Sequence, residues 1–460
     1  MPQLILISFL LFAAWLIRRD TRKREGISTA LWIPTLWIGI LSSRPVSAWL
    51  GGVGSGDSLD GSPLDRLFYL AIIVASIVIL VQRQVDWGRL LGNNWPLVLL
   101  YGFFFLSVLW AFSPFVSFKR WFKEVGNIFV VLVILTEANP REATKAVFIR
   151  CTYVLVPLSL IFVRYFPDLG RRYSPHTGGL EVIGVTFQKN SLGTMLLVCG
   201  VIFLWDWIER SRDKSQSHPA VDRYVPMVIA GLILYLFQQC DSKTSMIALL
   251  LAGGITVTLK FPAMQARVKS FGIYLLFAAV VLFLLDRMVG VSEWIITSMG
   301  RDMTFTGRTE VWNALFAVGT DPLLGTGFMS FWDDPNFRSK LPYWVGGSAH
   351  NGYIEIYLFG GYVGLAILAI ALLGIGAAIN RDLRSGREYS VVRFAILVAT
   401  LVANFAESNF VCMTPLGFLF IIAAIGDGRL PVGVHQPADI SPSFPIGNAR
   451  APKAADAFPQ

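Results

Sequence analysis

The sequence predicts an all-α polytopic membrane protein with about 12–13 transmembrane helices and one large outer loop. The chain has 460 residues, of which 54% are hydrophobic and 15% charged, and its mean hydropathy is +0.59. A soluble protein carries about 25% charged residues. Several apolar runs approach the roughly 20 residues that a helix needs to cross a bilayer. They do not alternate as the strands of a porin do.

The apolar runs give the expected spans in order along the chain. They lie near residues 3–17, 29–43, 66–82, 96–112, 121–136, 146–164, 190–208, 225–240, 244–259, 271–289, 352–379, 392–406 and 411–426. Together they form one integral-membrane domain, residues 1–428. The tail, residues 429–460, is rich in Pro and Ala and poor in apolar residues, which predicts a disordered cytoplasmic segment.

The basic residues predict the orientation of these spans. Five of them follow the first apolar run, namely Arg18, Arg19, Arg22, Lys23 and Arg24. A cleavable signal peptide has its positive charges before its apolar core, so this run is expected to stay as a span. Loops rich in Lys and Arg face the cytoplasm, which places the N-terminus outside and gives cytoplasmic loops at 83–95, 137–145, 209–224, 260–270 and 380–391. Because topology accounts for most of the net charge of +9, we expect no nucleic-acid partner.

Metal, disulfide and dinucleotide sites find little support in the sequence. The four cysteines, Cys151, Cys199, Cys240 and Cys412, lie in or beside apolar runs without a Cys-x-x-Cys spacing. The pair Asp333-Asp334 has no evident third ligand. The glycines of residues 51–56 follow no predicted strand and precede no helical pattern, which indicates a flexible loop.

The outer face collects the polar residues that topology does not explain. It receives the long loop at about 290–351 and several shorter turns. Basic residues on this side run against the usual bias and predict an anionic ligand at the outer surface. The cluster comprises Arg44, Lys119, Arg120, Arg171, Arg172, His176, Lys189, Asn190, Lys243, Arg301, Arg308 and His350.

His350 is the strongest candidate for chemistry. Ser348 is a plausible N-cap for the span that follows, which would place His350 in the first helical turn. Free N–H groups there bind anions and favour a neutral imidazole, as a general base must be. Gly361 lies about three turns further on and would share a helical stripe with His350. The alternative is an interfacial histidine that only caps or packs.

Arg308 starts a second candidate element. Val311, Trp312, Leu315 and Phe316 share one helical face, which predicts a short amphipathic helix near the membrane. An arginine at its start suits a phosphate or diphosphate, onto which the guanidinium can fork. The alternative is an ion pair with Glu310 or Asp302. Residues 322–327, Pro-Leu-Leu-Gly-Thr-Gly, are typical of a turn that ends this helix.

The other outer cations have plain alternatives as well. The pair Arg171-Arg172 and the pair Lys189-Asn190 flank one outer loop, where basic side chains often reach lipid headgroups. Lys243 lies in the tight turn Asp241-Ser-Lys-Thr and would pair with Asp241 if it is buried.

The motifs in this order resemble the O-antigen ligase and polymerase superfamily of bacterial cell envelopes. They are Arg171-Arg172, Phe187-Gln-Lys-Asn-Ser-Leu-Gly193, Ser242-Lys-Thr244, Gly307-Arg-Thr-x-x-Trp312, Pro322-x-x-Gly-x-Gly327 and Ala349-His-Asn-x-x-x-Glu355 before Gly361. Ser113-Pro-x-x-Ser-x-Lys-Arg120 and Gly61-Ser-Pro-Leu-Asp-Arg66 resemble the exopolysaccharide-polymerase branch. The resemblance covers most of residues 44–425 and is strongest over 307–361. The chain departs from many relatives at Lys243, where they have Arg, and at Gln188, where they often have His.

The resemblance implies a fold, an activity and partners. Such proteins move a glycan from an undecaprenyl-diphosphate carrier to an acceptor hydroxyl at the periplasmic face of the inner membrane, without a metal or cofactor. His350 would be the base or acceptor-orienting residue, and Arg308 would hold the diphosphate. Substrate contacts are then expected from Arg171, Arg172, Lys189, Asn190, Lys243, Asn351, Glu355 and Gly361. The expected partners are the carrier-linked donor, a glycan or lipid acceptor, the bilayer and other polysaccharide-assembly proteins.

Two other functions are compatible with the sequence. A transporter or flippase of lipid-linked sugars would share the basic outer face, but it would place ionisable residues at mid-membrane, often in broken helices of an internal repeat. The sequence has few such charges and no obvious repeat. A non-catalytic scaffold of an envelope complex would tolerate the loss of His350.

Overall fold

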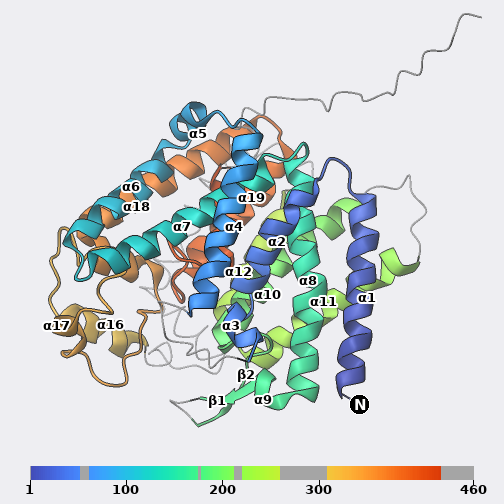
Figure 1. Ribbon diagram of the computed structural model, residues 1–460, viewed down its shortest axis with the longest axis horizontal. Coiled ribbons are helices and arrows are strands. Elements are labelled where there is room, and N and C mark those ends of the chain that lie inside the picture. Colours follow the sequence, from blue (N-terminus) through green and yellow to red (C-terminus); the bar gives the residue numbers. More distant parts are fainter. Residues whose placement is uncertain (1, 52–61, 175–177, 212–219, 260–307, 426–460) are drawn as a thin grey trace, which may run out of the picture.

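A computed structural model shows the chain as a bundle of helices with one short hairpin in the part described (Figure 1). It describes residues 2–51, 62–174, 178–211, 220–259 and 308–425. The first half contains α1 (Pro2–Lys23), η1 (Thr29–Leu31), α2 (Trp32–Leu41), α3 (Val46–Trp49), α4 (Pro63–Gln82), α5 (Trp87–Asn93), α6 (Trp95–Ser107), η2 (Val108–Trp110), α7 (Pro114–Leu135), α8 (Pro140–Tyr165) and α9 (Pro167–Gly170). The second half contains β1 (Arg171–Tyr173), β2 (Leu180–Val182), α10 (Lys189–Arg210), α11 (Ala220–Cys240), α12 (Lys243–Thr258), α16 (Arg308–Ala317), α17 (Pro335–Arg338), α18 (Gly352–Arg384), α19 (Glu388–Ala403) and α20 (Pro415–Ile425).

The predicted all-α polytopic membrane fold is confirmed. Within the described residues, five helices are long and apolar enough to cross a membrane, namely α4, α8, α10, α11 and α18. The bent pair of α5 with the helix Trp95–Trp110 adds a sixth candidate, and four shorter apolar helices accompany them. Each expected span coincides with one of the helices, except the span near 271–289, which lies outside the described residues together with the tail from 429.

The helices differ in how deeply the bundle surrounds them. Within its most apolar window, α8 is 83% buried, whereas α11 is only 22% buried. α8 packs against α1, α2, α10 and α11, and α20 packs against α10 and α19. Helix α8 is therefore central in the bundle, whereas most of the apolar surface of α4 and α11 is not buried by other helices.

One end of the bundle carries the irregular elements, and we call it the loop end. In Figure 1 it is the lower end, where α3, α9, the β1–β2 hairpin, α16 and α17 gather. The two strands are antiparallel, with Arg172 opposite Glu181. This hairpin was not predicted, because each strand has only three residues.

Helix α18 is broken at Gly361, where φ is 59° and ψ is −157°. The segment Pro322–Gly327 docks on the break through backbone hydrogen bonds, in which Thr326 N donates to Leu358 O at 2.9 Å and Tyr362 N donates to Pro322 O at 2.8 Å. A Cβ on Gly361 would come within 2.3 Å of the Leu323 backbone. The expected stripe of His350 and Gly361 on one continuous helix is therefore wrong. Gly361 lets two backbones meet.

The end opposite the loop end holds a buried ion network. Arg24, whose side chain is 3% exposed, pairs with Asp20 at 2.7 Å, Glu142 at 2.6 Å and Asp206 at 3.1 Å. Arg210 also pairs with both aspartates. The network joins α8 and α10 to the end of α1, so the basic cluster after the first span has a structural role in the bundle.

Candidate functional site

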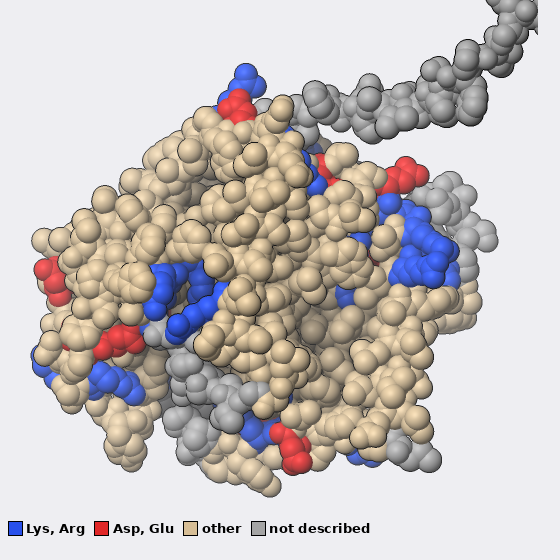
Figure 2. Space-filling view, in the orientation of Figure 1, with Lys and Arg blue, Asp and Glu red and all other residues tan. Residues whose placement is uncertain are grey.

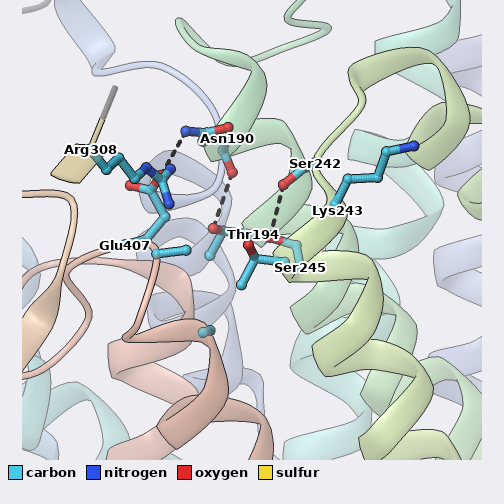
Figure 3. A pocket seen from close by; sticks show the side chains of 10 residues that line it. Asn190, Thr194, Ser242, Lys243, Ser245, Arg308 and Glu407 are labelled. Carbon is cyan, nitrogen blue, oxygen red and sulfur yellow. Dashed lines mark hydrogen bonds and ion pairs between the residues drawn. The ribbon is translucent and has the colours of Figure 1, made fainter. Parts of the chain in front are cut away.

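A small polar pocket lies at the loop end between the starts of α10 and α12 and the loop after α19 (Figure 3). It holds about 340 Å³ of space outside protein atoms, part of it open to solvent, and is lined by Asn190, Thr194, Ser242, Lys243, Thr244, Ser245, Arg308, Ala403, Ala406 and Glu407. Neither α10 nor α12 has a side-chain hydrogen bond at its N-cap. Two helix N-termini with their free N–H groups thus border the pocket, which favours an anion.

Gly193 allows the two helix starts to approach so closely. A Cβ at this position would lie 2.3 Å from Ser242 Oγ, so a larger residue would push α12 away from α10. Around this contact the hydroxyl groups point into the pocket, where Ser242 Oγ donates to Ser245 Oγ at 3.1 Å and Thr194 Oγ1 donates to Asn190 O at 3.1 Å. The pocket wall is therefore dense in hydrogen-bonding groups.

Glu407 is the centre of the site. Its carboxylate accepts hydrogen bonds from Asn190 Nδ2 at 2.6 Å and Arg308 Nη2 at 3.1 Å, and it lies 3.3 Å from His350 Nδ1. The three partners come from α10, α16 and the loop before α18, so a single carboxylate ties together segments that lie far apart in the sequence. The Glu407 side chain is 25% exposed and that of His350 36%, so the site is reachable from outside.

The packing of Gly352 on Asn404 brings the His350 and Glu407 loops together. Gly352 N donates to Asn404 O at 2.8 Å, and a Cβ on Gly352 would lie 2.0 Å from Asn404 Oδ1. The same Oδ1 atom accepts from the backbone N–H groups of Asn409 and Phe410. Asn404 therefore shapes the turn that presents Glu407, and only glycine fits opposite it.

His350 has an unusual backbone conformation, with φ at +48°. Residues other than glycine rarely adopt positive φ, and such strain is often found at functional sites. Ser348 Oγ accepts a hydrogen bond from His350 N at 3.1 Å. Among the described residues, the only hydrogen bond of the ring is that of Nδ1 with Glu407, so Nε2 is the nitrogen left to face a substrate.

The predicted cap of the following helix is wrong. Asn351, and not Ser348, is the N-cap of α18, and its side chain accepts from Tyr353 N at 2.9 Å and Ile354 N at 3.1 Å. His350 thus precedes the cap instead of lying in the first turn. Since Asn351 already satisfies these two N–H groups, the anion donors come from α10 and α12 and not from α18.

The short helix predicted after Arg308 is confirmed as α16, but of its predicted apolar face only Leu315 is buried, and Phe316 is exposed. Trp312 Nε1 donates to Ala349 O at 2.9 Å, which anchors α16 to the residue before His350. The ion pair of Arg308 with Glu407 at 3.1 Å was not among the partners predicted for it, because Glu407 lies 99 positions further along the chain. Asp302 and Gly307 lie outside the described residues.

Glu355 holds the loop before α18 in place through hydrogen bonds. It is buried, and it accepts hydrogen bonds from Ala349 N at 2.7 Å, Ser348 Oγ at 3.2 Å and Trp332 Nε1 at 3.0 Å. Asn351 and Glu355 do not line the pocket, and their contacts fix the conformation on both sides of His350. We therefore assign both as positioning residues.

Other predicted substrate residues lie away from the pocket lining. Arg171 Nε donates to Val163 O at 2.9 Å, while Arg172 and Lys189 both pair with Glu181, at 3.0 and 3.2 Å. Burial alone would raise the pKa of Glu181, but the two cations hold that pKa below its usual range. Of the Lys189-Asn190 pair, only Asn190 lines the pocket.

Lys243 lines the pocket, but its ammonium group points away from Arg308 and Glu407 (Figure 3). It pairs with Asp241 at 3.0 Å, which is the alternative that the sequence left open. The residues around Lys243, and above all Ser242 and Ser245, supply the polar groups on this wall. His176 and Arg301, two further candidates from the sequence, lie outside the described residues.

The chain is similar in sequence to known proteins. A family model described as O-antigen ligase matches residues 227–369, a stretch that contains Lys243, Arg308 and His350. The chain is also 23% identical over 393 residues to the exopolysaccharide production protein ExoQ of Rhizobium meliloti (strain 1021), which covers 80% of this chain and 86% of the relative. The chain is thus similar to the O-antigen ligase family over part of its length and to an exopolysaccharide production protein over most of it. Glu407 lies beyond the stretch that the family model matches.

Proposed function

We propose that this protein transfers a glycan from an undecaprenyl-diphosphate carrier to an acceptor hydroxyl, with inversion at the sugar and without a metal ion. The reaction would take place at the periplasmic face of a bacterial inner membrane, where the loop end would lie. The observation that carries this proposal is the triple contact of Glu407 with His350, Arg308 and Asn190. It joins a candidate base to a candidate phosphate-binding cation.

His350 is the proposed base. Glu407 on Nδ1 would hold the imidazole in the tautomer whose Nε2 can accept a proton, as a carboxylate partner does for other catalytic histidines. The acceptor oxygen then attacks C1 of the donor sugar and gives its proton to Nε2. The bond between C1 and the diphosphate oxygen breaks at the same time. A single displacement of this kind inverts the configuration at C1.

The departing diphosphate needs positive surroundings. Arg308 and the N-termini of α10 and α12 border the same pocket. Fixed donors that face developing negative charge lower the barrier of such a transfer. An arginine side chain carries five N–H donors in a planar fork that matches the oxygens of a phosphate group.

The test is to replace His350 with alanine in purified protein supplied with a lipid-diphosphate glycan. We expect His350→Ala to slow transfer by about 10²–10⁴-fold, the usual contribution of a general base, at an unchanged melting temperature. The control is Lys340→Ala, a change of an exposed lysine in the same loop, which should transfer normally. Full activity of His350→Ala would contradict the role of base.

The same assay separates the enzyme from a transporter. A transferase makes a new glycosidic bond and releases carrier diphosphate in detergent solution. A transporter reconstituted in vesicles would move the intact lipid-linked glycan across the bilayer without either product. Chain growth from the donor alone would indicate a polymerase, and growth only after a second acceptor is added would indicate a ligase.

A further inference from the structure

Two aromatic side chains are displayed in a tight turn between α17 and His350. Val345 N donates a hydrogen bond to Pro342 O at 3.0 Å, which makes Tyr343 and Trp344 the two central residues of a β-turn. Small, polar or proline residues usually occupy such positions. Tyr343 is nevertheless 97% exposed, and Trp344 is 37% exposed. Neither turn propensity nor burial therefore explains why two large aromatic residues stand here.

The turn is anchored on both sides, so the two rings are presented in a defined position. Leu341 precedes the turn and Val345 ends it, and both are buried. Arg338 Nη1 donates to Val345 O at 2.8 Å. In α17, Phe337 stacks on the buried ring of Phe331, with the ring centroids 5.5 Å apart. A ligand that binds to a rigid aromatic pair orders few side chains that were free before.

The polar groups of these two side chains are not used by the fold. Two other tryptophans of the same loop, Trp312 and Trp332, each donate an indole hydrogen bond that anchors the loop near His350. Among the described residues, neither Tyr343 nor Trp344 has a side-chain hydrogen bond. The phenol hydroxyl and the indole N–H are therefore available to a ligand.

An open track leads from the turn to His350. A Cβ on Gly346 or on Gly347 would meet no heavy atom within 4 Å, so the space beside both residues is open. Both glycines are exposed, Ser348 is half-buried, and the ring of His350 is 36% exposed. Tyr343 lies seven residues before His350, and an extended chain of that length spans at most about 25 Å. A short oligosaccharide can therefore reach from the imidazole to the two rings.

The chemistry of this surface matches a sugar better than an anion. One face of a sugar ring carries C–H groups that pack on an aromatic ring, while the hydroxyls around its edge need hydrogen-bonding partners. Tyr and Trp offer both, because each combines an apolar ring with a polar group. Figure 2 shows basic and acidic side chains side by side on uncharged surface in the part of the molecule that carries α17. Since neither sign of charge dominates there, a neutral polyhydroxylated ligand is the best match.

We propose that the 342–345 turn is a glycan subsite, in which Tyr343 and Trp344 stack on sugar rings beyond the reacting one. This inference rests on the proposed function, which brings a glycan to His350. The ligand is an oligosaccharide, either the glycan of the donor or that of the acceptor. The subsite favours long chains over short ones, because only a chain of several sugars reaches from His350 to the two rings.

The binding test requires no transfer. Glycan is released by mild acid from the lipid-linked glycans of the bacterium that makes the protein, and it is separated into a short and a long fraction. Isothermal titration calorimetry on the full-length protein in detergent measures the affinity for each. We expect the wild type to bind the long fraction more tightly. The double variant Tyr343→Ala, Trp344→Ala should lose about tenfold or more in affinity for the long fraction, the usual size of two aromatic contacts, and nothing for the short one.

Two control variants show whether the rings themselves are responsible. Tyr343→Phe, Trp344→Phe keeps both aromatic rings and should retain most of the affinity. Tyr173→Ala removes a tyrosine that is 76% exposed on β1 at the loop end, and it should bind like the wild type. The subsite is overturned if the alanine double variant binds the long fraction as the wild type does, since the turn would then face lipid headgroups or another protein. An equal loss for Tyr173→Ala would also overturn it.

The variant His350→Ala separates this inference from the proposed function. It should bind the long fraction like the wild type, although it transfers little glycan. Normal transfer by His350→Ala would contradict the proposed base, whereas the subsite would still be decided by the binding data.

Transfer kinetics of the alanine double variant identify the chain that the subsite holds. A KM that rises only for a long donor indicates the donor glycan, and one that rises only for a long acceptor indicates the acceptor glycan. An unchanged KM for both would overturn the subsite.

Discussion

The Arg24 network and the Glu407 site lie at opposite ends of the bundle, and they are built differently. At the end opposite the loops, Arg24 is 3% exposed and contacts three carboxylates, two of which also pair with Arg210. At the loop end, one carboxylate, Glu407, is shared by an arginine, an asparagine and a histidine whose ring is 36% exposed.

The difference supports a structural role for the Arg24 network and the proposed binding role for the Glu407 site. Around Arg24, buried charges of opposite sign pair with one another. These pairs link α1, α8 and α10. Around Glu407, the partners are donors on a pocket wall, and two helix N-termini point to the same space. A site for a passing anion needs that surplus of donors.

The largest expected effect on stability is at the buried network. Arg24→Ala removes the buried cation from Asp20, Asp206 and Glu142, and Arg210 stays as a partner of the two aspartates. Breaking a buried ion pair on one side costs about 3–5 kcal/mol, so the melting temperature in detergent should fall by several degrees. The matched control is Arg22→Ala, which changes an exposed arginine in the last turn of α1. This variant should melt like the wild type. An unchanged melting temperature for Arg24→Ala would remove the contrast between the two clusters.

A smaller effect, confined to the donor, is expected at Arg308. Arg308→Lys keeps the positive charge but loses the planar fork that binds phosphate oxygens in pairs. We expect KM for the lipid-linked donor to rise about tenfold, the size of one charge-assisted hydrogen bond, while KM for the acceptor stays the same. Steady-state kinetics with each substrate varied in turn measures both. Equal increases in the two constants would mean that Arg308 only positions the loop.

The smallest effect is expected at the hairpin. The side chain of Arg172 is 37% exposed and pairs with Glu181, and an ion pair of this kind contributes about 0–1 kcal/mol. Arg172→Ala should therefore change transfer by less than about twofold, although the sequence pointed to Arg172 as a substrate residue. A loss of transfer as severe as that expected for His350→Ala would mean that Arg172 contacts the substrate after all.

Hydropathy and helical periodicity predicted the helical membrane fold and α16, because these depend on residues close in sequence. The break of α18 at Gly361 could not be predicted in this way. It depends on an earlier segment, Pro322–Gly327, whose backbone forms hydrogen bonds with the groups that the break leaves free. Glu407 was missed for a similar reason. It follows α19 in a polar turn, and only the packing of Gly352 on Asn404 brings that turn to His350.

The sequence predicted the place of Lys243 near the site but not the direction of its charged group. Its position beside Ser242 was predicted to matter, and the turn does line the pocket. The direction of its side chain follows from the neighbouring Asp241, with which it pairs, and from the start of α12. The motif therefore predicted which segment lines the pocket, but it did not show which atoms of Lys243 face the pocket.

The coupling between His350 and Glu407 tests the central claim most directly. Transfer is measured for His350→Ala, Glu407→Gln and the double variant, at equal amounts of folded protein. If Glu407 acts through His350, Glu407→Gln should lose about 10–100-fold, as the loss of an orienting partner usually does, and the double variant should be no slower than His350→Ala. Losses that multiply in the double variant would contradict a joint action of the two residues.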